Sequence, residues 1–514
     1  MKRVRFAVLA PLLGCAFSVY AQEHAHPPPE KLGSVSFENT CAAGVQARFN
    51  RAVALLHSFA YTAAEQAFRA VAKADPTCAM AHWGIAMSYF HQLWEPPAGD
   101  DLRKASAEIE RARNPPAHSA RERAFIDAIA VYYRESDRLP HTSRVKTYVR
   151  AIADVASRNP DDAEAQIFYA LALIATASPT DATHVNQKLA GEILEPLYAR
   201  YPQHPGLAHY LIHAYDSTEL APRGLAAARA YAKIAPSVPH ALHMPSHIFT
   251  RLGYWDESIA SNLAARAAAH AEGDTGEELH AMDYLTYAYL QRGRDADAAH
   301  VVDDLKAMGS LTASQFKVGY AANAMPVRLA VEQQQWPTAA ALEPLPQSEP
   351  HVAAIVYWAR AIGHARGGHA DDADADIAKI DACIVQLKAA DNAYWATQTE
   401  VLADSARAWQ LKARGPADEA LLRLRAAADK EDTLEKRPVT PGPIVPAREQ
   451  LADMLIELDR PKDALHEYQT ALISAPGRRG ALTGAVKAAE RVGDAQTAAQ
   501  LRADLNGNSS SAKP

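Results

Sequence analysis

The chain has 514 residues, 48% of them hydrophobic, and a formal net charge of −7 with both signs spread along it. This length is enough for a large buried core. No long run of Lys or Arg is present, so we expect no nucleic-acid partner. Alanine is abundant, and the period-2 alternation that marks strands is nearly absent, which predicts an all-α protein.

The N-terminal stretch is predicted to be a signal peptide over residues 1–21. Three basic residues within the first five precede an apolar run, residues 6–17, that is too short to stay as a membrane-spanning helix. Small residues ending at Ala21 supply a cleavage site. The alternative is a lipobox, Leu-Leu-Gly-Cys, which would place a lipid anchor on Cys15.

Both interpretations predict export, to the periplasm of a bacterium, with lipid anchoring there or secretion as alternatives. Export exposes cysteines to oxidation. Cys41 precedes the first helix of one predicted repeat and Cys78 opens the first helix of the next, so we predict a disulfide between them, with Cys383 left over. Three buried thiols are the alternative. The rest of the chain has no run of 18 apolar residues, so no membrane span is expected.

Landmarks of the tetratricopeptide (TPR) repeat, a helix pair with a period of 34 residues, recur along the chain. In the first unit Ala64, Phe68 and Pro76 occupy the small, aromatic and helix-stopping positions. Counting helix pairs predicts about twelve units, stacked as a right-handed superhelix (an α-solenoid) whose concave groove is lined by first helices.

These signals divide the chain after the signal peptide into six parts. They are a disordered lead-in (22–40), an N-terminal TPR-like helical region (41–160), a central TPR array with a His-lined groove (161–430), a break (431–446), a C-terminal TPR and cap (447–505) and a disordered tail (506–514).

Two His-x3-His pairs stand out, His209 with His213 and His243 with His247, and the second pair follows the first by 34 residues. The same two positions of consecutive repeats therefore carry imidazoles. Residues four apart share a helix face, about 5–6 Å apart at Cβ, and stacked helices pack roughly 8–10 Å apart. The spacing predicts a two-by-two grid of imidazoles on one wall of the groove.

Neutral imidazole suits zinc, copper or iron, so the first hypothesis is a transition-metal site built from these four histidines. Nearby positions expected to face the groove, as outer partners of the metal or as groove residues, are Asp216, His240, His280, Asp283 and Tyr287. Asp216 would fix the outer nitrogen of a metal-bound histidine. The alternatives are histidines that bind an anionic or peptide ligand without metal, and histidines that only pack and hydrogen-bond.

Four strings resemble one family of exported bacterial TPR proteins. They are FNRAVALLHSFAYTAAEQAFRAVAKADPTCAMAHWGIAMSYFHQLWEPP, HMPSHIFTRLGYWDESIASN, HAMDYLTYAYLQ and EDTLEKRPVTPGPIVPAREQLADMLIEL. HMPSH is the most specific of these elements, and the resemblance covers nearly the whole mature chain. It implies the repeat fold and export, and it supplies no reaction. In some relatives a second histidine stands where this chain has Asp283.

Two functions follow as hypotheses. The first is a secreted or periplasmic binding or scaffold protein whose groove holds a peptide, a protein or a small ligand. The alternative is a metalloenzyme, hydrolytic or oxidative, with the His grid around its metal. No nucleophile elbow, His-Glu-x-x-His zinc motif, phosphate loop or dinucleotide fingerprint is present. A further group near the N-terminus is expected to be packing; its members are His57, His82, His91, Trp94 and Glu95.

Overall fold

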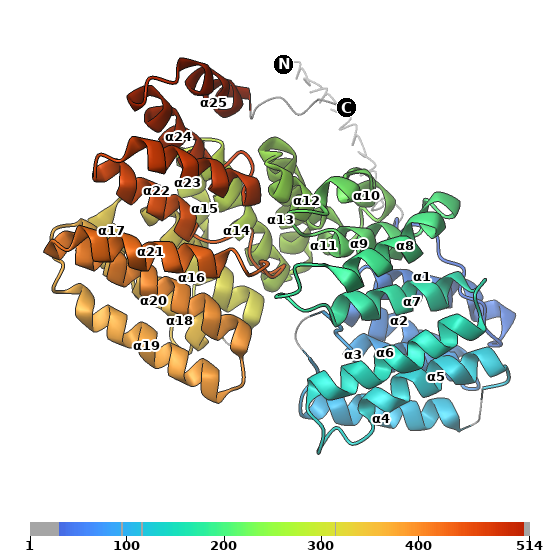
Figure 1. The fold of residues 1–514 in the computed structure, drawn as a ribbon. Coiled ribbons are helices and arrows are strands. Elements are labelled where there is room, and N and C mark those ends of the chain that lie inside the picture. The colour runs from blue at the N-terminus through green and yellow to red at the C-terminus, as the bar shows by residue number, and fades with distance from the viewer. Residues whose placement is uncertain (1–29, 94–95, 115–116, 314, 508–514) are drawn as a thin grey trace, which may run out of the picture. The chain divides into compact units, whose positions relative to one another are not determined.

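The computed structural model describes residues 30–93, 96–114, 117–313 and 315–507. Within these ranges the chain forms helices and no strand, so the all-α prediction is confirmed (Figure 1). In the part that is described, no helix has the length and apolar character needed to cross a membrane. The predicted signal peptide and the histidines of the lead-in, His24 and His26, lie outside the described residues.

One 3₁₀ helix and 25 α-helices follow one another in this part of the chain. They are η1 (Ala43–Val45), α1 (Gln46–His57), α2 (Tyr61–Ala74), α3 (Ala79–Tyr89), α4 (Asp100–Arg113), α5 (Ala120–Tyr133), α6 (His141–Arg158), α7 (Ala163–Ala175), α8 (Val185–Arg200), α9 (Pro205–Ala214), α10 (Ala221–Ile234), α11 (Pro239–His243), α12 (Pro245–Leu252), α13 (Trp255–Glu272), α14 (Thr275–Gln291), α15 (Asp295–Ala307), α16 (Phe316–Glu332), α17 (Trp336–Ala340), α18 (Pro350–Arg366), α19 (Ala373–Ala389), α20 (Ala393–Arg414), α21 (Ala417–Glu431), α22 (Ala447–Glu457), α23 (Pro461–Ser474), α24 (Arg479–Arg491) and α25 (Ala495–Gly507). With α11 and α12 counted as one interrupted helix, these α-helices form twelve successive pairs, as the repeat count predicts.

At two places in the array, an aromatic ring of one helix pair packs against a glycine of the next helix pair. A Cβ atom on Gly84 of α3 would lie 2.3 Å from the ring of Phe68 in α2. Sixteen residues also separate Tyr468 of α23 from Gly484 of α24, where the corresponding distance is 2.1 Å. The glycine therefore leaves the space that the ring of the preceding helix fills. This explains why the repeat keeps a small and an aromatic residue at fixed spacing.

The HMPSH stretch is a first helix interrupted by a proline. Pro245 has no N–H to donate, so α11 ends at His243 and α12 begins at Pro245. Met244 between them keeps helical dihedral angles (φ −52°, ψ −36°). His243 and His247 therefore stay one turn apart on the same face, although the hydrogen-bond ladder is broken.

Residues 31–40, predicted to belong to a disordered lead-in, pack against the helices. Phe37 is fully buried, and its ring lies 5.2–5.5 Å from the rings of Phe49, Trp83 and Phe125. Burial of a Phe side chain contributes roughly 1.5–3 kcal/mol, which is enough to hold a short polar segment against the helices. The proline-rich composition of the lead-in concealed this single anchoring residue.

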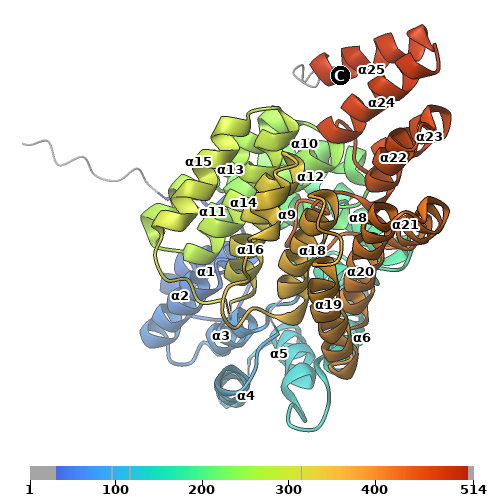
Figure 2. The same cartoon turned by 90° about the vertical axis from the view of Figure 1, so that its left-hand side faces the viewer.

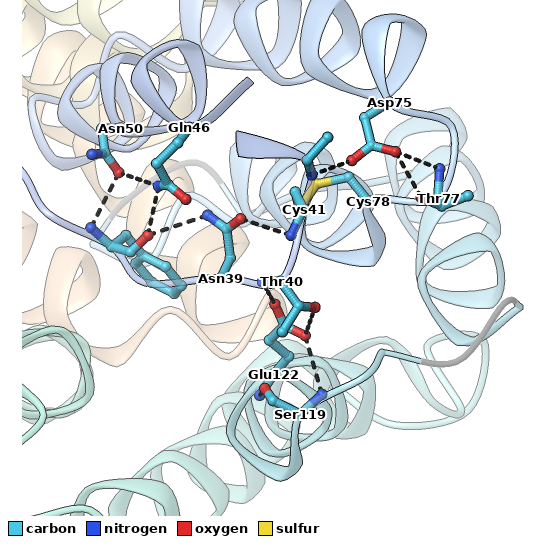
Figure 3. Close-up of a disulfide and its surroundings, with 12 residues drawn as sticks. Asn39, Thr40, Cys41, Gln46, Asn50, Asp75, Thr77, Cys78, Ser119 and Glu122 are labelled. Atoms are coloured by element: carbon cyan, nitrogen blue, oxygen red, sulfur yellow. Dashed lines mark hydrogen bonds between the residues drawn. A yellow bond between two sulfur atoms is a disulfide. The ribbon is translucent and has the colours of Figure 1, made fainter. Parts of the chain in front are cut away.

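A disulfide joins Cys41 and Cys78, the predicted pair, just after this segment (Figure 3). Asp75 lies beside it and accepts hydrogen bonds from the backbone N–H of Ala42 (2.7 Å) and the hydroxyl of Thr77 (2.7 Å). These bonds hold the pKa of Asp75 below its ordinary value. Cys383 is free and buried.

Replacing both Cys41 and Cys78 with serine should lower the stability of the N-terminal repeats by about 2–4 kcal/mol, because the cross-link closes a loop of 37 residues and restricts the unfolded chain. Thermal denaturation followed by circular dichroism measures the change. A reductant should shift the wild-type transition in the same way and leave that of the double variant where it is. Equal melting temperatures for wild type and variant would contradict the prediction.

Candidate metal centre

Six buried histidines lie on consecutive first helices. His209 and His213 belong to α9, His240, His243 and His247 belong to α11 and α12, and His280 belongs to α14. Each is at most 6% exposed. Figure 2 shows these helices as neighbours. Their ring nitrogens form two groups of three, and within each group the nitrogens lie within 4.8 Å of one another.

The first group contains His209, His213 and His240, and the second contains His243, His247 and His280. In both groups the i, i+4 pair meets through its Nε2 atoms, at 3.1 Å in the first and 3.0 Å in the second. Between the groups, the ring centroids of His213 and His247 lie 6.2 Å apart and those of His240 and His243 lie 6.4 Å apart.

The four predicted metal ligands, His209, His213, His243 and His247, are thus divided between two neighbouring groups and do not surround one spot. His240 and His280, expected as outer or groove residues, bring the third ring of each group.

The hydrogen bonds of the second group fix the protonation of its paired rings. His243 Nδ1 lies 2.6 Å from Asn262 Oδ1, and the amide nitrogen of Asn262 donates to the carbonyl of Ser258, so its oxygen faces the ring. His247 Nδ1 lies 3.0 Å from a carboxylate oxygen of Asp216. Because both acceptors need a donor, both Nδ1 atoms carry the proton. In a neutral imidazole the Nε2 atom is then a lone-pair acceptor.

The two Nε2 atoms that face each other at 3.0 Å therefore both present lone pairs. Burial lowers the pKa of His243 well below its ordinary value and that of His247 to about 4, so neither ring is cationic at neutral pH. A cation bound to both nitrogens would resolve the repulsion. Zn–N bonds of 2.0–2.1 Å in a tetrahedron place two nitrogens about 3.3 Å apart, close to the observed separation.

In the first group, the hydrogen bonds constrain the protonation of the rings less tightly. His209 Nδ1 donates to the carbonyl of His57 at 2.6 Å, which leaves the lone pair of its Nε2 atom toward His213. His213 Nε2 can supply a proton to this contact, so a hydrogen bond is sufficient to explain it. Burial lowers the pKa of both rings well below the ordinary value.

Asp216 links the second group to distant parts of the chain. Besides His247, its carboxylate accepts from Arg251 Nε at 2.9 Å and from Lys436 Nζ at 3.1 Å. Burial would raise the pKa of Asp216, but Lys436 and Arg251 hold it well below the ordinary value. The carboxylate is therefore ionised and keeps the Nδ1 proton on His247. An acceptor on the outer nitrogen of a histidine is the usual companion of a metal ligand.

The predicted break between α21 and α22 is a strap, residues 432–446, that crosses from the C-terminal repeats to α14 (Figure 1). Lys436 reaches Asp216, and the carbonyls of Pro438 and Thr440 accept from the hydroxyl of Tyr284 at 3.0 and 3.2 Å. The ring of Tyr284 lies 4.8 Å from that of His243. The strap therefore packs directly over the second group.

Two predicted groove residues lie elsewhere. Asp283 accepts from Arg328 Nε at 2.8 Å, and Tyr287 accepts from Arg478 at 3.4 Å. Neither belongs to a histidine group. Sequence reasoning missed Tyr284 and Asn262, although both stand in the strings that carry the family resemblance. The one-turn spacing from His280 to Tyr284 was the available signal.

In a third group, His57, Glu164 and His204, hydrogen bonds to the carboxylate explain the close approach of the three side chains. The carboxylate of Glu164 accepts from His57 Nε2 at 2.9 Å and from His204 Nε2 at 3.1 Å. The hydroxyl of Tyr210 lies 3.0 Å from the other nitrogen of His57. Since the carbonyl of His57 accepts the hydrogen bond from His209 Nδ1, this network positions the first histidine group.

Packing explains the other N-terminal histidines as predicted. His82 bonds Glu108 at 2.6 Å and His91 stacks on Tyr61 at 4.2 Å. Trp94 and Glu95 lie outside the described residues.

A pocket of about 50 Å³ reaches the second group at the edge of the strap. His280 lines it together with Lys317 of α16 and Arg437 of the strap. Lys317 bonds Glu277 at 2.6 Å, and Glu277 lies 3.3 Å from His240 Nδ1. The guanidinium of Arg437 lies over the ring of Tyr394, at 4.7 Å. The approach to His280 is therefore lined by two basic side chains, one of which is neutralised by Glu277.

These features define a TPR-like, all-helical repeat protein with buried histidine groups able to hold metal ions. No known family model and no curated protein matches the chain. Among solved structures it is similar to a human IFIT1 dimer with m7Gppp-AAAA, at 10% identity over 84% of this chain and 90% of that one, with a TM-score of 0.33. It is also similar to a monomeric IFIT1 mutant with Gppp-AAAA, at 12% identity over 83% of this chain and 90% of that one, with a TM-score of 0.35.

Replacing Arg328 with methionine should destabilise the protein by about 3–5 kcal/mol, because Asp283 would remain buried without its cation. Arg328 also donates to Thr440 Oγ1 (3.0 Å) and the carbonyl of Gly442 (3.1 Å), so the strap should loosen. Thermal denaturation measures the first effect, and the rate of tryptic cleavage after Lys436 measures the second.

The matched control for this variant is Arg502→Met, which removes an exposed ion pair with Glu490 and should cost under about 1 kcal/mol. Unchanged melting and unchanged cleavage in Arg328→Met would contradict the assigned role of Arg328.

Proposed function

We propose that this protein binds a transition metal ion between His243, His247 and His280. The observation that carries the proposal is the pair of facing Nε2 atoms, both left without a proton by their outer partners. Imidazole donors suit zinc, copper and iron. Three protein ligands leave a further coordination position for water or a small ligand. The first group, with the same donors, is a second candidate position for an ion.

We further infer that the protein is exported, as the signal-like N-terminus and the resemblance to exported TPR proteins with the HMPSH element suggest. The disulfide between Cys41 and Cys78 is consistent with an oxidising compartment. In this setting its function is that of a binding protein that holds a metal, with a small molecule, a peptide or a protein as the partner of its repeat array.

Metal-stripped protein should regain at least one equivalent of Zn²⁺ or Co²⁺, measured by calorimetry and by the visible absorption of bound cobalt. The His247→Ala variant removes one of three ligands and should bind more than about 100-fold more weakly, a larger loss than the 10–100-fold typical of an outer partner. The matched control is His351→Ala, which removes a buried histidine stacked on Trp395 at 4.3 Å, outside the three groups. Its metal binding should equal that of the wild type.

Asp216→Asn gives a graded second measurement if His247→Ala does not fold. Asparagine keeps the shape but weakens the acceptor for His247 Nδ1, so affinity should fall about 10–100-fold. Wild-type protein that binds none of Zn²⁺, Co²⁺, Cu²⁺ or Fe²⁺ at micromolar concentration would refute the proposal. Equal affinity in wild type and His247→Ala would also refute it.

A metalloenzyme, hydrolytic or oxidative, is the second candidate function. The pocket beside His280 favours it, because an open coordination position there would face a small cavity. Arg437 gives this pocket a positive charge that suits a small anionic group, whereas Lys317 is paired with Glu277.

In cobalt-loaded protein, inorganic phosphate or acetate at millimolar concentration should change the visible spectrum. Arg437→Gln should weaken this effect several-fold, whereas Arg460→Gln, an exposed arginine of the C-terminal repeat paired with Asp463, should not. No spectral change with either anion would restrict the centre to metal binding.

A further inference from the structure

A pocket of about 700 Å³ lies among the C-terminal repeats and shares no lining residue with the histidine groups. Its walls come mainly from α16, α17, α18, α20, α22, α23 and α24, with Leu290 of α14, Asp295 of α15 and Val445 of the strap at the edge. This volume lies within the range of small-molecule sites, about 300–1,000 Å³. Its walls combine carboxylates with the indole rings of Trp336, Trp358 and Trp409.

The carboxylates follow one face of α22. Glu449, Asp453 and Glu457 are each four residues apart, and all three line the pocket. Four residues rise about 6 Å along a helix, so the negative charges form a regular row. Glu332, at the end of α16, adds another carboxylate to the pocket.

The protein leaves one member of this row without an ion pair in the described part of the chain. Arg478 pairs with both Glu332 (2.7 Å) and Glu449 (2.5 Å), and Glu457 pairs with both Arg366 (2.6 Å) and Lys412. Asp453 accepts a hydrogen bond from the hydroxyl of Tyr468 at 2.5 Å and, among the described residues, makes no ion pair.

The pKa values agree with this incomplete neutralisation. Burial raises the pKa of Asp453, and burial together with the nearby carboxylates raises that of Glu449 to about 7. A positive charge beside Asp453 would therefore be stabilised.

The aromatic wall already holds a cation. The guanidinium of Arg366 lies 4.4 Å from the ring centre of Trp336 and 4.0 Å from that of Trp409. The indole N–H of Trp409 donates to Gln450 Oε1 at 3.1 Å, which fixes the ring plane. Ring faces in this arrangement attract a cation, so the protein's own guanidinium occupies one end of the pocket. Arg479 and Lys487 of α24 are the other basic side chains of the lining, and in the described structure neither forms an ion pair with Asp453.

We propose that this pocket binds a small linear polyamine, with one ammonium group on Asp453 and the chain extended along the carboxylate row of α22. The spacing of the carboxylates matches that of ammonium groups separated by methylene linkers. The indole rings of the wall can pack against the methylene groups and attract the ammonium charges. A free polyamine is small enough for a volume of about 700 Å³, whereas a folded partner is not. The site is independent of the metal centre, because neither its lining nor its charges include the histidine groups.

The test is calorimetric titration of the full-length, metal-stripped protein with spermidine. One equivalent should bind with submillimolar affinity, and a neutral diol of similar length should not bind. Asp453→Asn removes the charge on the unpaired carboxylate and should weaken binding about tenfold or more. Asp418→Asn, an exposed aspartate in the first turn of α21, is the matched control and should have no effect.

The Arg366→Met substitution should change the affinity for spermidine in the opposite direction. It frees the space between Trp336 and Trp409 and leaves Glu457 with one cation fewer, so spermidine should bind several-fold more tightly. General loss of structure would weaken binding in both variants and would show as lowered melting temperatures. The proposal is overturned if spermidine does not bind the wild type, if Asp453→Asn binds it as tightly as the wild type does, or if an oligolysine peptide binds where spermidine does not.

Discussion

The repulsion between two imidazole lone pairs in a dry interior is the constraint on which the centre depends. His243 and His247 face each other through Nε2 because Asn262 and Asp216 hold the protons on their outer nitrogens. Asp216 can remain ionised there only because cations neutralise it, and one of them, Lys436, comes from the strap. The histidine pair, the buried carboxylate and the strap thus form one electrostatic unit, although 220 residues separate Asp216 from Lys436.

The sequence was sufficient to predict the helix pairs, their number, the Cys41–Cys78 bridge and the face shared by each His-x3-His pair, because all of these follow from local spacing. The division into two groups was not predictable in this way. It depends on the lateral offset between neighbouring repeats, which brings His280 to one pair and His240 to the other. The period predicts which positions are equivalent and leaves undetermined how far one helix is displaced past the next.

Contacts between residues far apart in the sequence were the other feature that could not be predicted. Asp283 has the spacing of a groove residue, yet a buried arginine from the following repeat, Arg328, takes its carboxylate. The proline-rich strap has the composition of a connection, and only its contacts with Tyr284 and Asp216 show that it covers the histidines. Three of the four strings that resemble the exported family supply these parts, namely the histidines, Tyr284 and the strap.

The strap comes late in the chain, so the histidines are synthesised before the segment that packs over them. All six histidines have been synthesised by residue 280, whereas Thr440, which covers Tyr284, follows that tyrosine by 156 residues. A chain that emerges from its N-terminus therefore presents the imidazoles to its surroundings before their cover exists. The proposed ion would have its freest access during that interval, and in the folded protein the small pocket beside His280 would be its approach.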